Sequence, residues 1–109
     1  MVCQELSGNL ALVERHRLAV SILDDSRLKV SFAYDIDTVP TLILTDGEGG
    51  ERRRLIGFER GEWADLADLL AREAEHDGAA IDWDAYPAWR PGCGSKSADP
   101  TVADRLRAE

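Results

Sequence analysis

The feature that most constrains this chain is a proline placed directly before a run of strand-forming residues. Pro40 precedes residues 41–44 (TLIL), which are apolar or β-branched. Because proline has no backbone N–H to donate to a neighbouring strand, it belongs at the start or the edge of a sheet strand. Its ring also forces the residue before it, Val39, into an extended conformation. The segment therefore predicts a strand that begins at Pro40, directly after an extended residue.

The N-terminal segment has the periodicity of a helix. Leu6, Leu10 and Val13 recur at spacings of four and three, which predicts a helix over residues 3–16 with an apolar stripe facing the core. Cys3 would then lie in the first helical turn, where unpaired amide groups and the helix dipole favour a thiolate over a thiol. The alternative is that Cys3 is a terminal thiol without a partner.

Two further elements separate this helix from the Pro40 strand. Residues 18–23 form a short apolar run that is typical of a buried strand. The acidic and serine-containing cap that follows predicts a second, short helix over residues 26–34, in which Leu28 and Phe32 are four residues apart. Before Pro40, the chain order is therefore helix, strand, helix.

Downstream of Pro40, the sequence predicts a hairpin and a third helix. Residues 46–50 (DGEGG) suit a turn, and residues 52–58 can return as an antiparallel strand. The three arginines at the start of this strand invite a phosphate-binding interpretation. We favour another one, because charges on an edge strand are the usual protection against edge-to-edge pairing. Residues 61–76 are amphipathic and predict a surface helix docked on the sheet.

This order of elements resembles a known family. The resemblance is carried by the hairpin turn and the following helix, together with Tyr34, Ile36, Val39, Pro40, Thr41 and Gly57. Over about residues 3–74, the chain resembles the carboxyl-terminal half of a thioredoxin-like domain. The resemblance implies an α/β fold in a truncated thioredoxin-like form, helix-strand-helix-strand-strand-helix, followed by an irregular C-terminal extension.

The resemblance also implies which residues form a site. Cys3 matches the second cysteine of a Cys-x-x-Cys motif, and Pro40 matches a proline whose peptide bond is cis and which lies against the redox cysteines. These two are the expected catalytic residues. In that family, the residue before the proline pairs with an extended substrate, so Val39 is expected to bind substrate together with Thr38 and Gly57. A glycine in a β-bulge is the other explanation of Gly57.

The first cysteine of the motif would stand one residue before Met1, so that Met1 and Val2 would be its two middle residues. We expect an N-terminally truncated form that lacks the family's first strand-helix-strand and its first redox residue. That residue would be a cysteine, or a selenocysteine, whose codon is ordinarily read as stop.

Without the missing strands, the sheet would leave backbone groups unpaired, each costing about 1–3 kcal/mol if buried. Either the remaining strands move together, or a second chain fills the gap, or the protein extends upstream, which we favour.

These implications predict a thiol–disulfide oxidoreductase. The missing nucleophile would attack a substrate disulfide held against Val39, and Cys3 would resolve the mixed disulfide. The partner would be a protein disulfide or a reductase, and no cofactor or metal is expected. The alternative is a redox-inert thioredoxin-like binding or assembly module, whose exposed strand edges recruit a partner or join two copies in a homodimer.

Residues 77–109 differ in character from the domain predicted over residues 1–76. Prolines interrupt any long element, and spaced aromatic residues would lay this extension over the domain surface. Asp99 and Pro100 are a suitable cap and first residue for a last short helix that runs through Leu106.

Cys93 lies between two glycines and is expected to be an accessible thiol. It would pair with Cys3, form a mixed disulfide with another molecule, or stay inert. The surrounding segment is not a phosphate loop, because Ser95 separates the glycine from Lys96. A zinc site is not expected either, because the cysteines and histidines of the chain lack the short paired spacing of zinc ligands. They are Cys3, His16, His76 and Cys93.

Charge and hydropathy exclude two further classes of function. The 13 basic and 21 acidic residues give a net charge of −8, which disfavours binding to nucleic-acid phosphates. No segment approaches the roughly 18 consecutive apolar residues of a membrane helix, and the N-terminus lacks the pattern of a secretory signal. We therefore predict a cytoplasmic protein that binds neither nucleic acid nor membrane.

Overall fold

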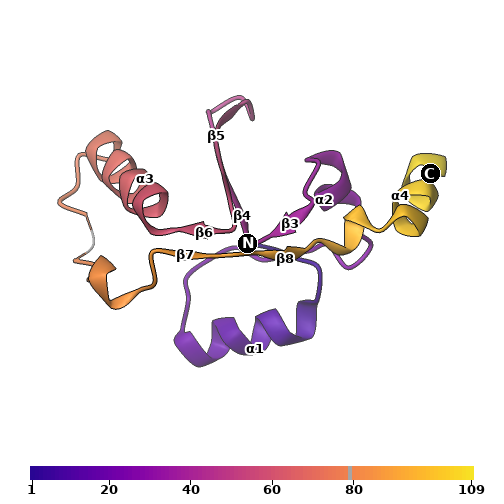
Figure 1. Ribbon diagram of the computed structural model, residues 1–109, viewed down its shortest axis with the longest axis horizontal. Coiled ribbons are helices and arrows are strands. Elements are labelled where there is room, and N and C mark those ends of the chain that lie inside the picture. Colours follow the sequence, from indigo (N-terminus) through magenta and orange to yellow (C-terminus); the bar gives the residue numbers. More distant parts are fainter. Residues whose placement is uncertain (79) are drawn as a thin grey trace. The chain divides into compact units, whose positions relative to one another are not determined.

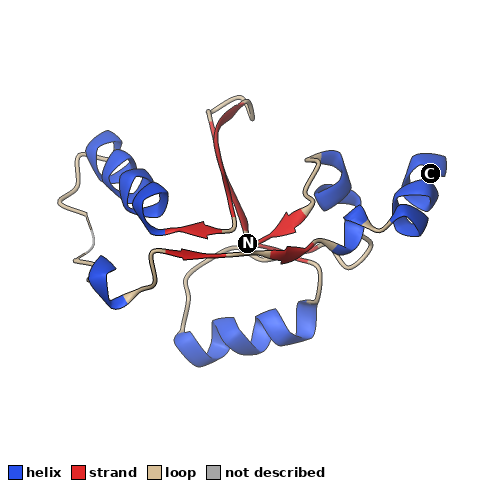
Figure 2. Ribbon diagram, viewed as in Figure 1, coloured by secondary structure: helices blue, strands red, loops and turns tan. Residues whose placement is uncertain are grey.

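Helices and short paired strands alternate along the chain, which is a mixed α/β protein (Figure 1, Figure 2). The computed structural model describes residues 1–78 and 80–109. Its contacts divide the chain into two units, one formed by residues 1–37 with 94–109 and the other by residues 38–93. Residues 77–109, predicted as one extension, therefore contribute to both units.

The first unit begins with two short parallel strands, β1 (Val2–Cys3) and β2 (Leu23–Asp24). The N–H of Leu23 donates to the Met1 carbonyl at 2.9 Å, and the N–H of Asp25 donates to the Cys3 carbonyl at 2.8 Å. Helix α1 (Leu6–His16) connects the strands.

The pairing of β1 with β2 corrects two predictions. Cys3 lies in a strand and not in the first turn of a helix, because its backbone is bonded to the segment around Asp25. The strand predicted over residues 18–23 is limited to β2 at its far end, since this is where the partner strand lies.

The predicted core-facing stripe of α1 is also wrong in part. Leu6 and Val13 are half-buried, Leu10 is 46% exposed, and α1 contains no buried residue. A helix of 11 residues is about 16 Å long. Strands of two residues each are too short to cover such a helix.

The rest of the first unit is helical. Helix α2 (Lys29–Ala33) contacts a 3₁₀ turn, η2 (Lys96–Ala98), and helix α4 (Pro100–Ala108). The prediction for α4 is confirmed, since the Asp99 side chain accepts a hydrogen bond from the Thr101 N–H at 2.8 Å and Pro100 is the first helical residue. The predicted second helix forms, but within narrower limits. The buried apolar residues of this unit are Cys3, Leu28, Ala103 and Leu106.

The second unit contains the predicted hairpin and third helix. Strands β4 (Thr41–Thr45) and β5 (Glu51–Ile56) are antiparallel, and Leu42 lies opposite the buried Leu55. The Asp46 carboxylate accepts from the N–H groups of Glu48 and Gly50 at 2.8 Å each, which closes the turn. After β6 (Phe58–Glu59), helix α3 (Arg60–Glu73) begins where the Glu59 side chain accepts from the Gly61 and Glu62 amides.

The chain then returns along the same unit. After a 3₁₀ turn, η1 (Trp83–Ala85), strand β7 (Trp89–Arg90) runs antiparallel to β6, with Phe58 opposite Arg90 and Glu59 opposite Trp89. Strand β8 (Cys93–Gly94) pairs with β3 (Thr38–Val39). We call residues 86–93 the strap.

The prediction that aromatic residues lay the C-terminal extension over the surface of the domain is confirmed in part. The Tyr86 ring lies 6.4 Å from that of Phe58 and 6.3 Å from that of Trp83, whereas Trp89 is 63% exposed.

Candidate functional site: a strand edge filled by the strap

The predicted proline lies at the junction of β3 and β4. The peptide bond between Val39 and Pro40 is cis, as the resemblance implies. The Pro40 carbonyl accepts a hydrogen bond from the Gly57 N–H at 2.9 Å, and the Thr41 hydroxyl donates to the Thr38 carbonyl at 2.6 Å. These bonds hold β3 against the end of the hairpin, where β5 passes into β6.

Gly57 is buried at the junction between β5 and β6 and has a φ of 70°. A methyl group on Gly57 would lie 3.3 Å from the amide nitrogen of Gly92 and 3.4 Å from the carbonyl of Arg90. The position therefore requires glycine for two reasons, its left-handed backbone conformation and the close approach of the strap backbone. The contact agrees with the expectation that a backbone segment passes close to Gly57, and here that segment belongs to the chain itself.

Gly92 is the residue at which the predicted substrate-binding residues meet. A methyl group on Gly92 would collide with the Thr38 side chain and would lie 2.7 Å from the Val39 carbonyl oxygen. Gly57 contacts Gly92 as described above. Thr38, Val39 and Gly57 therefore all lie against one extended segment of the chain itself.

The two cysteines have opposite environments. Cys3 is 1% exposed at the end of β1 in the first unit, and its sulfur lies 4.0 Å from the Met1 carbonyl. Cys93 belongs to the second unit and is exposed on β8, as predicted. Both are free thiols.

A buried polar network adjoins Cys3, and the sequence analysis did not identify it. The Gln4 amide donates to the hydroxyls of Ser31 at 2.9 Å and Ser95 at 2.7 Å, and its oxygen accepts from the Lys96 N–H at 3.2 Å. Ser95 is also bonded to Ser97, oxygen to oxygen, at 2.8 Å. The network therefore fixes the residue after Cys3 to the segment after Gly94.

Asp25 continues this network. It is 3% exposed and accepts from the Val30 and Ser31 amides at 2.9 and 2.8 Å and from the Ser31 hydroxyl at 2.6 Å. The sequence placed Asp25 in the acidic cap before the second helix, and its bonds to the Val30 and Ser31 amides agree with that position. The partners of Gln4 are too distant along the chain for any local pattern.

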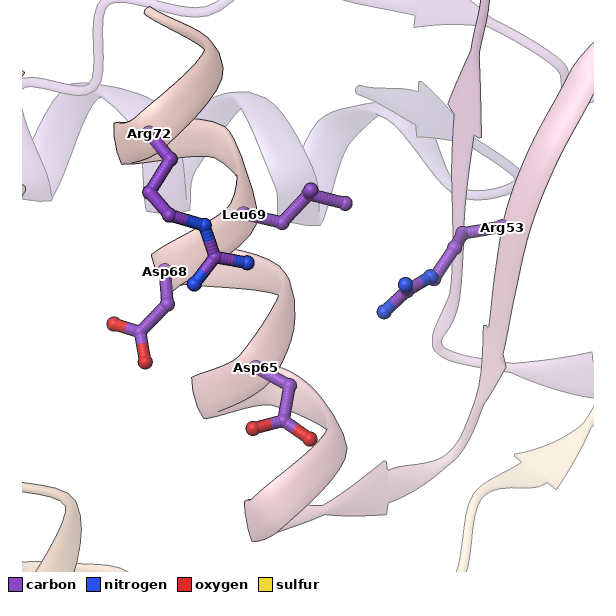
Figure 3. Close-up of a pocket in the computed structure, with 5 residues that line it drawn as sticks. All are labelled: Arg53, Asp65, Asp68, Leu69 and Arg72. Carbon is purple, nitrogen blue, oxygen red and sulfur yellow. The ribbon is translucent and has the colours of Figure 1, made fainter. Parts of the chain in front are cut away.

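A polar cleft of about 260 Å³ lies between β5 and α3 (Figure 3). Arg53 extends from β5 toward the helix, which contributes acidic, basic and apolar side chains. The helix residues lining the cleft are Asp65, Asp68, Leu69 and Arg72. The negative charges of two carboxylates therefore balance the positive charges of two guanidinium groups. The cleft has no excess of positive charge that would attract a phosphate.

The other two arginines of the run are paired with acidic residues. Arg52 binds both carboxylate oxygens of Glu73 at 2.8 and 2.6 Å, and these bonds lower the pKa of Glu73 and raise that of Arg52. Arg54 binds Glu51 at 2.7 Å, which lowers the pKa of Glu51. These pairs support the edge-strand interpretation of the arginines over phosphate binding.

Within residues 1–78 and 80–109, no group of three or more His, Cys, Asp or Glu side chains is placed to hold a metal ion. None of the helices that the structure describes is both long and apolar enough to cross a membrane. Comparison of the chain with protein-family models, curated proteins and solved structures found no match.

Proposed function

We propose that this protein is a thioredoxin-like thiol–disulfide oxidoreductase. The strand edge around Val39 would hold the substrate, and Cys3 would be the resolving thiol. The observation that carries the proposal is the contact of Thr38, Val39 and Gly57 with one extended backbone at Gly92. A substrate segment that presents a disulfide must be extended to pair with a strand edge. An edge that already accommodates such a segment is suited to this task.

The proposed reaction has two steps, and its first nucleophile is a cysteine or selenocysteine three positions before Cys3. This anion attacks one sulfur of the substrate disulfide, forms a mixed disulfide or selenylsulfide with it, and releases the other sulfur as a thiolate. The Cys3 thiolate then attacks the nucleophile, forms an intramolecular bond with it, and releases the second substrate sulfur. The substrate gains two electrons and two protons, and the protein is oxidised.

The buried position of Cys3 supports the resolving role over the attacking role. At 1% exposure its sulfur is out of reach of a bulky protein substrate, so the intramolecular second step is the one that suits it. The proposed partners are a protein disulfide and a reductase. The proposed location is the cytoplasm, where thiols are kept reduced, in agreement with two free cysteines.

Insulin reduction by dithiothreitol tests the proposal on a chain extended by one cysteine directly before Met1, and on the Cys3→Ser and Cys93→Ser variants of that extended chain. Loss of activity with Cys3→Ser alone supports the proposal. Coding sequence before Met1 gives a second test, since the proposal requires an in-frame cysteine codon or UGA directly upstream. Absence of both, together with equal turnover by all three proteins, contradicts it.

A second candidate is a redox-inert binding or assembly module. It is supported by the pairing of β6 with β7, because a strand edge that pairs with an extended segment of its own chain could pair with one from a partner. This candidate predicts no insulin reduction in any variant and stable complexes or homodimers through strand edges, measured by light scattering.

A further inference from the structure

The strap is held to the second unit by its backbone. Strand β7 pairs with β6, the Arg60 N–H donates to the Ala88 carbonyl at 2.9 Å, and the Arg60 guanidinium donates to the Tyr86 carbonyl at 2.8 Å. Near its other end, Gly92 lies against Val39 and Gly57. These contacts are ones that an extended peptide could make, because they involve main-chain atoms of the strap. The Tyr86 ring adds a side-chain contact with Phe58.

The side chains of the strap contribute little burial. Every residue from 86 to 93 is exposed except Gly92, which is half-buried, and Trp89 is 63% exposed. Segments with few buried apolar contacts open at low free-energy cost compared with the core. A second peptide with the same backbone contacts can therefore replace the strap.

We propose that β3, Gly57 and β6 form a binding edge for extended peptides that carry glycine at the position of Gly92, and that the strap is its intramolecular occupant. The peptide that displaces the strap would be a segment of a disulfide-containing protein. This identity of the peptide is the one part of the inference that rests on the proposed function. When the strap is in place, the edge is closed to such a segment.

The requirement for glycine follows from contacts and not from backbone conformation. A methyl group at Gly92 would meet the Val39 carbonyl at 2.7 Å, which real Cβ atoms do not tolerate, whereas a methyl group at Gly94 has no atom within 4 Å. The two glycines flank Cys93, so Gly94→Ala is a matched control for Gly92→Ala.

The test uses a fluorescent peptide of residues 86–94 that carries Cys93→Ser, to prevent disulfide formation, and measures its binding by anisotropy. We expect the full chain with Gly92→Ala to bind this peptide about tenfold more tightly than the wild type or Gly94→Ala, because the internal strap no longer competes.

A second peptide with Gly92→Ala reports on the edge itself and stays informative if one chain variant does not fold, as judged by circular dichroism. It should bind every folded chain at least about tenfold more weakly than the glycine peptide, since its methyl group meets Val39. Equal binding of both peptides, or no binding to any folded chain, overturns the inference. Peptide binding without insulin reduction leaves the edge intact and contradicts only the proposed redox function.

Discussion

Single residues determine how closely the backbone segments of the second unit approach one another. Gly57 and Gly92 lack side chains where β3, β6 and the strap meet, and a methyl group on either would contact backbone atoms of a neighbouring segment. In the first unit, Asp25 has a comparable role, because one carboxylate satisfies three donors at the start of α2.

Gly57→Ala should destabilise the protein by about 1–2 kcal/mol, the usual cost of a left-handed conformation for a residue with a Cβ. Contact with the Gly92 nitrogen at 3.3 Å adds to this loss. Urea denaturation followed by circular dichroism measures it. Gly47→Ala is the control, since a methyl group there has no atom within 4 Å. Equal losses in the two variants would show that neither the left-handed conformation of Gly57 nor the approach of the strap contributes to stability.

Asp25→Ala should lower the free energy of unfolding by about 1–3 kcal/mol, because its buried amide and hydroxyl partners lose their acceptor. Asp25→Asn keeps one carbonyl acceptor and should lose less. The same urea titration measures both variants, and an Asp25→Ala chain as stable as the wild type would contradict this role.

Among the elements, the β4–β5 hairpin is closed by a charged group at its turn. Hydrogen bonds from the backbone N–H groups of Gly50 and Glu48 lower the pKa of Asp46 below its ordinary value of 3.8. A carboxylate with a lowered pKa stabilises the folded state fully above its ordinary value, and this contribution is lost as the pH falls through the folded-state pKa.

The hairpin turn should therefore open more readily in acid. In the wild type, hydrogen exchange at the Glu48 and Gly50 amides, after correction for intrinsic rates, should become less protected as the pH falls below the ordinary carboxyl pKa of 3.8. Asp46→Ala should show the low protection already at neutral pH and change little on acidification. A wild-type protection that stays constant as the solution is acidified through and below that value would contradict the role of the carboxylate.

At the scale of the whole molecule, the first unit is built from both ends of the chain. Residues 1–37 and 94–109 belong to it, and Gln4 joins them through Ser95 and the Lys96 amide. Folding of this unit therefore requires contacts that are more than 90 residues apart in the sequence.

Gln4→Ala should destabilise the first unit by about 1–3 kcal/mol, since buried hydroxyl groups and an amide lose their partner. Hydrogen exchange in α4 should also increase, because α4 follows the segment that Gln4 holds. Asn9→Ala is the control, as the Asn9 amide donates to the Glu5 carbonyl within α1. An increase in α4 exchange for Asn9→Ala as large as for Gln4→Ala would contradict the connection.

The sequence by itself determined the elements that depend on neighbouring residues. The strand after Pro40, the DGEGG turn, α3 and the capped α4 follow from periodicity, turn residues and N-caps, all of which act over a few positions. The exposure of Cys93, between two glycines, was also predicted from its neighbours. The role of Thr38, Val39 and Gly57 in substrate binding was implied by the family resemblance and stays a prediction.

The tertiary structure alone decided which distant backbones are paired. Pairing with β2 places Cys3 in a strand despite the helical spacing that follows it. The strap lies against the strand edge at which the resemblance led us to expect a substrate. Backbone N–H and C=O groups are the same in every residue except proline, which lacks the N–H, so a local pattern carries little information about their long-range partners. That choice depends on which segments the rest of the fold brings together.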